Sequence, residues 1–226
     1  MKSPVLLAAL MLSVQISAHA QEAKPLTTNA ERFSYGIGLQ IGQQLKRQGL
    51  SGIDTGAIAL AIEDVLQGRN LRVTMEEMQV AATAYQNERN AEKLAAASKN
   101  KAAEEQFLKQ NSTREGVVVL DSGVQYRILA RGTGKPPTET DTVMVHYRGR
   151  LLDGTEFDSS YTRGEPTELG VGQVIPGWQE ALQLMPVGAK WEVWIPASLA
   201  YGDQGAGTIG PNETLHFDIE LIEIKG

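Results

Sequence analysis

Aromatic and branched side chains beside turns are the most distinctive candidates for a site in this chain. These residues are Tyr147, Phe157, Val174, Ile175, Trp178, Tyr201, Ile209 and Phe217. An acidic residue, Asp158, directly follows Phe157, and the loop from Ala200 to Pro211 holds four glycines. Such side chains either fill the core of a small sheet domain or line an apolar binding pocket. Composition alone leaves both interpretations open.

Residues suited to acid–base, nucleophilic or metal chemistry are scarce. Beyond the first twenty residues only His146 and His216 remain, each in a strand pattern where a surface residue is more usual than a catalyst. The absence of cysteine excludes disulfides, thiol catalysis and cysteine-ligated metal. No phosphate-binding loop or nucleophile elbow occurs. We therefore expect no metal and no cofactor, and a net charge of −6 gives no basic surface for nucleic acid.

Alternating apolar and polar residues after Arg114 predict a β-rich domain. The strand patterns cover residues 117–120, 124–130, 143–152, 191–195 and 215–224, with turn residues between them. One helical pattern, Trp178 to Leu184, is closed by Pro186 and Gly188. This order predicts an α+β fold in which an antiparallel sheet wraps on a short helix.

Helical patterns fill the chain before that domain. Two short helices are expected within residues 28–49 and 54–68. A capping box at Thr74 and Glu77 opens a third, and no glycine or proline interrupts it before Ser112. From residue 87 to 106 this helix is polar on every side, which is typical of a strut that crosses solvent between domains.

The first helix carries an apolar stripe that two short helices cannot cover alone. The stripe consists of Phe33, Ile37, Ile41 and Leu45, which recur every four residues. Gly38 and Gly42 lie one turn apart and allow another helix to approach closely. We expect a homodimer through this all-α arm.

The first twenty residues have the pattern of a leader peptide. Lys2 precedes an apolar stretch, and Ala18 and Ala20 occupy the small-residue positions of a cleavage site. An uncleaved anchor is the alternative, but the stretch is short for a membrane span of about 20 residues.

The chain is expected to have four parts. We expect a signal peptide over residues 1–20, a helical dimerisation domain over 21–73, a connecting helix over 74–112 and a sheet domain over 113–226, with no membrane span after cleavage.

Five sequence runs carry a resemblance to a known family. They are Val145–Gly149, Leu151–Ser160, Val174–Trp178, Leu199–Gly202 and Thr214–Asp218. In order and spacing they resemble the signature blocks of the FK506-binding (FKBP) type of prolyl isomerase, over about Gly116 to Lys225. The helical arm resembles that of macrophage infectivity potentiator proteins and related periplasmic isomerases.

The resemblance implies a pocket with the indole of Trp178 as its floor. Its walls would be Tyr147, Phe157, Val174, Ile175, Ile209 and Phe217. Asp158, Tyr201 and Trp178 are the implied catalytic residues: Tyr201 would donate its hydroxyl to a substrate carbonyl, and Asp158 would form a polar rim. The Ile175 N–H would hold the peptide backbone. Thr167 and Leu169 stand where the family usually has aromatic residues, and Ala206 where some members have histidine, so the specificity of the pocket stays open.

The resemblance also implies a peptidyl-prolyl cis–trans isomerase that assists the folding of exported proteins. Its partners would be unfolded or partly folded proline-containing proteins in a periplasm, with the outer surface as the other location. Rapamycin or tacrolimus would inhibit it. A holdase-type chaperone with vestigial isomerase activity is one alternative, and a coiled-coil adaptor capped by the sheet domain is another.

The expected chemistry is non-covalent. Rotation of a prolyl amide moves no proton and breaks no covalent bond, so catalysis should consist of binding the twisted amide more tightly than either planar isomer. All implied pocket residues follow Arg114. The arm is therefore expected to add nothing to the turnover of a short peptide.

Overall fold

The computed structural model describes residues 25–225, and the expected leader peptide with its cleavage site lies outside them. The chain divides into two compact units, one ending at Ala59 and the other beginning at Leu60. Among the described helices, none is both long enough and apolar enough to cross a membrane.

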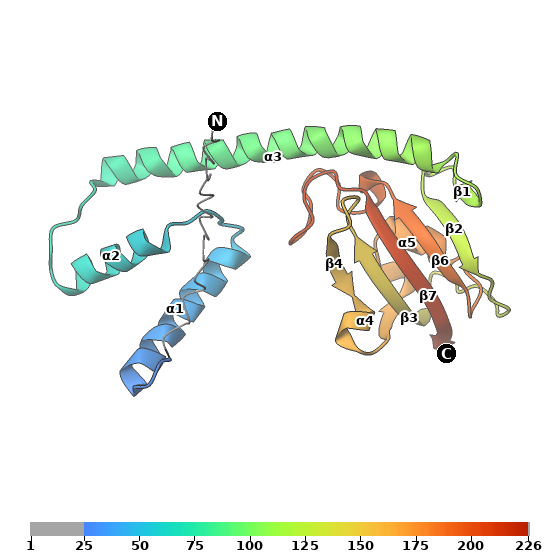
Figure 1. Ribbon diagram of the computed structural model, residues 1–226, viewed down its shortest axis with the longest axis horizontal. Helices are drawn as coiled ribbons and strands as arrows, with labels where there is room; N and C mark the ends of the chain where they lie inside the picture. The colour runs from blue at the N-terminus through green and yellow to red at the C-terminus, as the bar shows by residue number, and fades with distance from the viewer. Residues whose placement is uncertain (1–24, 226) are drawn as a thin grey trace, which may run out of the picture. The chain divides into compact units, whose positions relative to one another are not determined.

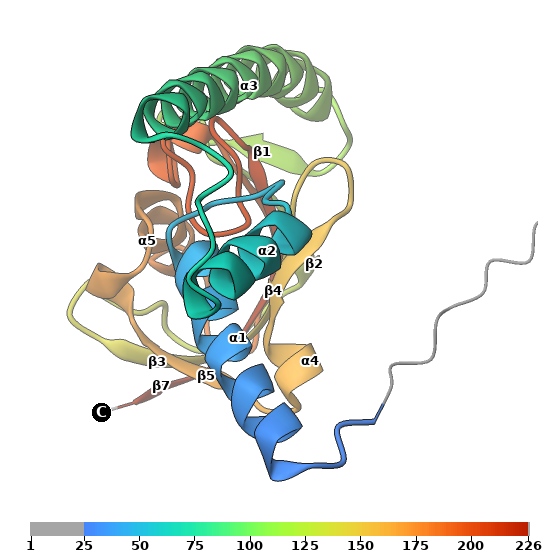
Figure 2. The same ribbon diagram turned by 90° about the vertical axis from the view of Figure 1, so that its left-hand side faces the viewer.

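The first helices are α1 (Asn29–Arg47) and α2 (Thr55–Leu66), which Figure 2 shows as separate helices joined by a loop. Thr28 caps α1, because its side chain accepts from the Glu31 N–H while the Glu31 carboxylate accepts from the Thr28 N–H. Asp54 caps α2 by accepting from the N–H groups of Gly56 and Ala57. No residue of α1 is buried: of its apolar stripe, Phe33 and Ile37 are exposed, and Ile41 and Leu45 are half-buried.

The long helix α3 (Met75–Asn111) begins with the predicted capping box of Thr74 and Glu77. Its C-terminal end leads directly into the sheet domain (Figure 1). The expectation of a strut surrounded by solvent is wrong for the second half of the helix. Ala97, Asn100 and Glu104 are half-buried, because this half packs on the sheet domain that follows it.

The C-terminal turns of α3 cover the face of the sheet on which Trp194 lies. The rings of Phe107 and Trp194 have centroids 6.4 Å apart, and the Arg114 guanidinium lies 5.6 Å from the Trp194 ring centroid. Trp194 is only 2% exposed as a result. Beside it the buried Asn111 donates to Gln125 Oε1 at 2.9 Å, and Gln125 Nε2 donates to the Leu108 carbonyl at 2.9 Å. The helix end is therefore part of the domain that it precedes.

The domain is a seven-stranded sheet whose paired strands are all antiparallel. Its strands are β1 (Val117–Val119), β2 (Gln125–Ala130), β3 (Thr142–Arg150), β4 (Glu156–Ser159), β5 (Thr167–Gly170), β6 (Lys190–Ile195) and β7 (Leu215–Lys225). They lie in the order β1-β2-β6-β7-β3-β4, and β5 pairs with β3. Buried residues alternate along β3, as expected for a strand with one face on a core.

One helix, α5 (Pro176–Leu182), packs on the core face of this sheet, which confirms the α+β prediction. Trp178, Ala181 and Leu182 are its buried apolar residues. The close packing depends on Gly177, because a Cβ there would lie 2.3 Å from Ile195 Cγ2. A larger residue would push α5 away from the sheet.

The sequence patterns missed the short elements between β3 and α5. The strands β4 and β5 and the one-turn helix α4 (Ser160–Arg163) fall in a segment with no clear periodicity. The helix α5 also begins two residues before the predicted Trp178, because Pro176 occupies its first turn. A backbone N–H at that position would have no partner within the helix, so proline is tolerated there. Two short 3₁₀ turns, η1 (Val171–Gln173) and η2 (Ala197–Leu199), complete the domain.

We predict that Phe107→Ala lowers the free energy of unfolding of the sheet domain by about 2 kcal/mol, because it removes a half-buried ring that packs on Trp194. Leu94→Ala is the matched control, since Leu94 lies on the same helix and is 69% exposed. Urea unfolding followed by tryptophan fluorescence measures both. Equal stability of the two variants would contradict the packing of α3 on the sheet.

Candidate active site

An apolar pocket opens between α5, the segment before it, the strands β3, β4, β5 and β7, and the loop that carries Tyr201. Its volume is about 360 Å³. It is lined by Tyr147, Phe157, Asp158, Leu169, Gln173, Val174, Ile175, Trp178, Tyr201 and Phe217. The structure thus brings together the predicted site residues from distant parts of the chain, with one exception described below.

The floor of the pocket is a set of aromatic rings packed edge to face. Tyr147 meets Trp178 at 5.3 Å between centroids with the planes at 90°, and Phe217 meets Trp178 at 5.1 Å and 89°. Phe157 meets Phe217 at 5.6 Å and 88°. Perpendicular contacts suit the positive edge and negative face of aromatic rings, so they fix the orientation of each ring as well as its position. Only 4% of Trp178 is exposed.

The closeness of these rings depends on Gly149 of β3. A Cβ at Gly149 would lie 2.6 Å from Phe157 Cζ and 2.7 Å from Phe217 Cε1. Such distances are shorter than real side chains tolerate, so any larger residue would displace two walls of the pocket. Here glycine is required by a close approach of side chains and not by its own backbone angles.

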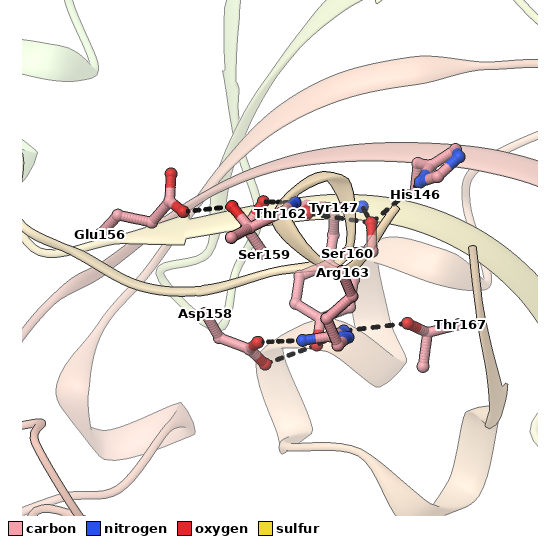
Figure 3. A network of polar contacts seen from close by, with 9 residues as sticks. All are labelled: His146, Tyr147, Glu156, Asp158, Ser159, Ser160, Thr162, Arg163 and Thr167. Atoms are coloured by element: carbon pink, nitrogen blue, oxygen red, sulfur yellow. Dashed lines mark hydrogen bonds and ion pairs between the residues drawn. The ribbon is translucent and has the colours of Figure 1, made fainter. Parts of the chain in front are cut away.

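The polar edge of the pocket is a hydrogen-bonded group centred on Asp158 (Figure 3). The Tyr147 hydroxyl donates to Asp158 Oδ2 at 2.5 Å. Arg163, at the end of α4, donates to Asp158 Oδ1, to the Tyr147 hydroxyl at 2.9 Å and to Thr167 Oγ1 at 3.0 Å. The group fixes both oxygens of the carboxylate and pairs its charge with a guanidinium.

These hydrogen bonds and the partial burial of the site shift the pKa values of Asp158 and Tyr147. Partial burial by itself would raise the pKa of the Asp158 carboxyl, but the hydrogen bonds from Tyr147 and Arg163 and the guanidinium charge outweigh it, and the pKa lies below its ordinary value. Burial raises the pKa of the Tyr147 hydroxyl, and the bond to Asp158 adds to that effect. At neutral pH the pocket therefore contains a carboxylate and a neutral phenol.

Two residues that line the pocket carry donors without a hydrogen-bond acceptor in the described part of the chain. The Ile175 N–H and the Tyr201 hydroxyl have no hydrogen-bond partner among the described residues. Ile175 directly precedes α5, and its carbonyl accepts from the N–H groups of Trp178 and Gln179. Tyr201 is 41% exposed.

Ile209 is the predicted wall residue that does not line the pocket. It lies in the loop that carries Tyr201, but its side chain is only 8% exposed and belongs to the core cluster. The sequence analysis in turn missed Gln173, which lines the pocket, and Arg163, which pairs with Asp158. No motif marked either residue. Their roles depend on the turns η1 and α4, which the sequence patterns did not predict.

The histidines lie outside the pocket lining, in two other polar groups. His146 Nδ1 is 3.0 Å from the Ser160 hydroxyl. His216 lies near Glu192 and Asp218 on the opposite face of the sheet, and the ligand atoms of these three residues are within 4.8 Å of one another. The sequence showed no such cluster because only strand pairing assembles it. Arg127 and Arg150 already pair with the two carboxylates, which makes the cluster a network of salt bridges.

The pocket thus combines an aromatic floor with an ion-paired polar rim. Residues 133–222 match the family described as FKBP-type peptidyl-prolyl cis-trans isomerase. Residues 30–128 match the domain amino terminal to FKBP-type peptidyl-prolyl isomerase. The chain belongs to the FKBP-type peptidyl-prolyl cis-trans isomerases and is of the Mip and FkpA kind.

Curated relatives extend this similarity over nearly all of the chain. The chain is 45% identical to the outer membrane protein MIP of Legionella longbeachae, covering 100% of this chain and 99% of that protein. It is 47% identical to the FKBP-type 22 kDa peptidyl-prolyl cis-trans isomerase of Escherichia coli strain K12, covering 84% and 93%. The crystal structure of FkpA from Escherichia coli matches with a TM-score of 0.64 at 32% identity, covering 89% of this chain and 99% of that one. The protein is accordingly a prolyl isomerase, and the predicted enzyme class is confirmed.

We predict that kcat/KM for a prolyl peptide is constant from roughly pH 5 to 9. Because the pKa of Asp158 is lowered, its carboxylate keeps its hydrogen bonds, and the stability they contribute, at every pH above the ordinary pKa of 3.8. They are lost only as the pH falls through the lower pKa of the folded protein. The raised pKa of Tyr147 keeps the hydroxyl protonated beyond 10.0. The profile is measured with a peptide that does not itself titrate in this interval. A limb of the profile inside it would reveal a titrating catalytic group.

Proposed function

We propose that the pocket catalyses prolyl isomerisation by binding the twisted amide without covalent chemistry. The observation that carries the proposal is a pair of donors on residues lining the apolar pocket, the Ile175 N–H and the Tyr201 hydroxyl, which have no partner within residues 25–225. The proline ring of the substrate lies on Trp178. The two donors bind carbonyl oxygens of the peptide and orient the chain.

Physical chemistry explains why an apolar site suits this reaction. Amide conjugation gives the prolyl bond a rotational barrier of about 18–20 kcal/mol. The twisted amide has lost this conjugation, so its carbonyl is less polar and loses less on leaving water. A pocket that prefers the twisted form over both planar forms lowers the barrier, because only differential binding accelerates a reaction.

Asp158 has an electrostatic and orienting role in this proposal. Its carboxylate is fixed by Tyr147 and Arg163, so it does not transfer a proton. The carboxylate lies at the rim of the pocket and favours the reduced negative charge on the oxygen of a twisted amide. Arg163 keeps the carboxylate ionised and in place.

We predict that Tyr201→Phe and Asp158→Ala each lower kcat/KM several-fold, on the scale of about 1 kcal/mol for one orienting hydrogen bond. Trp178→Ala should lower it further, because it removes the floor. Turnover of a prolyl tetrapeptide by the full-length protein measures all three.

Tyr161→Phe is the matched control for the tyrosine variant, since Tyr161 lies outside the pocket and stacks on His146. Rapamycin or tacrolimus should compete with the peptide for the same pocket. Leu169 lines that pocket where an aromatic is usual in the family, which favours weaker macrolide binding. Wild-type turnover in all three pocket variants would refute the site assignment.

We further propose that the protein is a homodimer through α1 and α2. Large apolar side chains of α1 are exposed in the single chain: Phe33 by 73%, Tyr35 by 63%, Ile37 by 46% and Leu39 by 51%. A hollow along α1 is lined by Gly38, Gly42 and neighbouring residues. A second copy of the same helix, approaching at the glycines, would remove this surface from water.

The proposed clients are unfolded or partly folded proline-containing proteins in a periplasm, with the outer surface as the other location. The expected leader peptide supports export. A curated relative is named an outer membrane protein. The names of the other relatives favour an isomerase over a holdase chaperone or a structural adaptor.

We predict that Gly38→Leu combined with Gly42→Leu yields monomers. A Cβ at either glycine meets nothing within 4 Å in the single chain, whereas a leucine there would obstruct a partner helix that approaches at the glycines. Sedimentation measures the oligomeric state, with Gln40→Leu on α1 as control. The monomer should retain peptide turnover but assist proline-limited refolding of a whole protein less well, because two linked pockets raise effective concentration. A monomeric wild type, or a dimeric double variant, would contradict the proposed interface.

A further inference from the structure

One stripe of α3 contacts the loop that carries Tyr201. The contact residues on the helix are Lys93, Ala97, Asn100 and Glu104, which recur every three or four residues and so share one face. The loop runs from Pro196, before η2, to Thr214, before β7. It includes Tyr201 and the buried Ile209.

Glu104 joins the two ends of this loop. Its Oε2 accepts from the Ala197 N–H at 2.6 Å and from the Thr214 hydroxyl at 2.8 Å. Thr214 is 1% exposed. Bonds to a charged acceptor in partly buried surroundings are among the stronger hydrogen bonds in proteins. One carboxylate oxygen thus holds the residue four positions before Tyr201 and the residue at the far end of the loop.

Asn100 binds the returning half of the loop. Its amide donates to the Pro211 carbonyl at 2.9 Å and to Glu213 Oε1 at 2.9 Å. Further out along the helix, Lys93 donates to Gln204 Oε1 at 2.9 Å. Helix and loop therefore meet from the start of the loop to a point beyond Tyr201.

The loop transmits this attachment to Tyr201 through its own backbone. The Gly202 N–H donates to the Ala197 carbonyl, which belongs to the residue that Glu104 holds. The Asn212 N–H donates to the Gly202 carbonyl and so joins the two halves of the loop beside Tyr201. Shifts at the attachment points would move the Tyr201 side chain, which is 41% exposed.

We propose that Glu104 and Asn100 are positioning residues of the isomerase, which act by holding the Tyr201 loop against the pocket. The second half of α3 is then part of the catalytic unit. This replaces the expectation that the chain before Arg114 adds nothing to peptide turnover. The inference rests on the proposed role of the Tyr201 hydroxyl, and its test separates the two.

The test compares variants of the full-length protein in a tetrapeptide isomerisation assay. Glu104→Ala and Asn100→Ala should each lower kcat/KM roughly fivefold, the scale of one or two lost hydrogen bonds. Glu104→Gln should retain most of the activity, because the amide oxygen can still accept from both donors. The exposed neighbours Glu105→Ala and Lys101→Ala are matched controls and should behave as wild type.

A double-mutant cycle with Tyr201→Phe distinguishes positioning from general stability. If Glu104 acts through the hydroxyl, its replacement should cost less than twofold once the hydroxyl is gone. Equal losses in both backgrounds would overturn the inference, as would wild-type turnover in Glu104→Ala and Asn100→Ala. Should Glu104→Ala not fold, the same cycle with the more peripheral Asn100→Ala decides. Wild-type turnover in Tyr201→Phe alone would overturn the role of the hydroxyl, whereas a loss there with none in the helix variants would overturn only the positioning.

Discussion

The close packing of α5 on the sheet is the constraint on which the pocket depends. Gly177 permits it, because any Cβ at this position would collide with the buried side chain of Ile195. Trp178 is the next residue, so its indole is fixed between Tyr147 and Phe217 at nearly perpendicular angles. Gly149 applies the same condition from the sheet, by leaving room for Phe157 and Phe217. Two glycines, Gly149 and Gly177, therefore allow the close packing that forms the floor of the site.

The polar half of the site is built from local chain geometry. Ser159 caps α4 by accepting from the Thr162 N–H, and Gly164 ends that helix with a left-handed backbone at φ 82°. This single turn returns the chain so that Arg163 reaches Asp158, five residues earlier. The carboxylate gains a fixed counter-charge and two fixed donors. An ion pair at a half-exposed rim adds little stability, so its value lies in orientation and in a constant charge.

The sequence predicted those parts of the structure that arise from periodic patterns and recognisable runs. The capping boxes at Thr28 and Thr74 identified helix starts, and the family resemblance identified most of the pocket lining. Arg163 and Gln173 could not be found in this way, because one-turn elements have no period. The packing of α3 was missed for another reason. Polar residues such as Asn100 and Glu104 resemble a solvated surface, unless their partners in a loop more than a hundred positions later are known.

A rigid surrounding is a physical requirement of this kind of catalysis. Because no covalent bond changes, the enzyme can lower the barrier only through contacts that differ between the planar and twisted amide. Those contacts lose their selectivity if the groups that make them can follow the substrate from one form to the other. Trp178 is held by packing and Asp158 by Arg163, but Tyr201 is 41% exposed and lies on a glycine-rich loop. A stiff helix bonded to both ends of that loop restricts the movement of Tyr201. This explains why the polar stripe of α3 belongs to the catalytic unit.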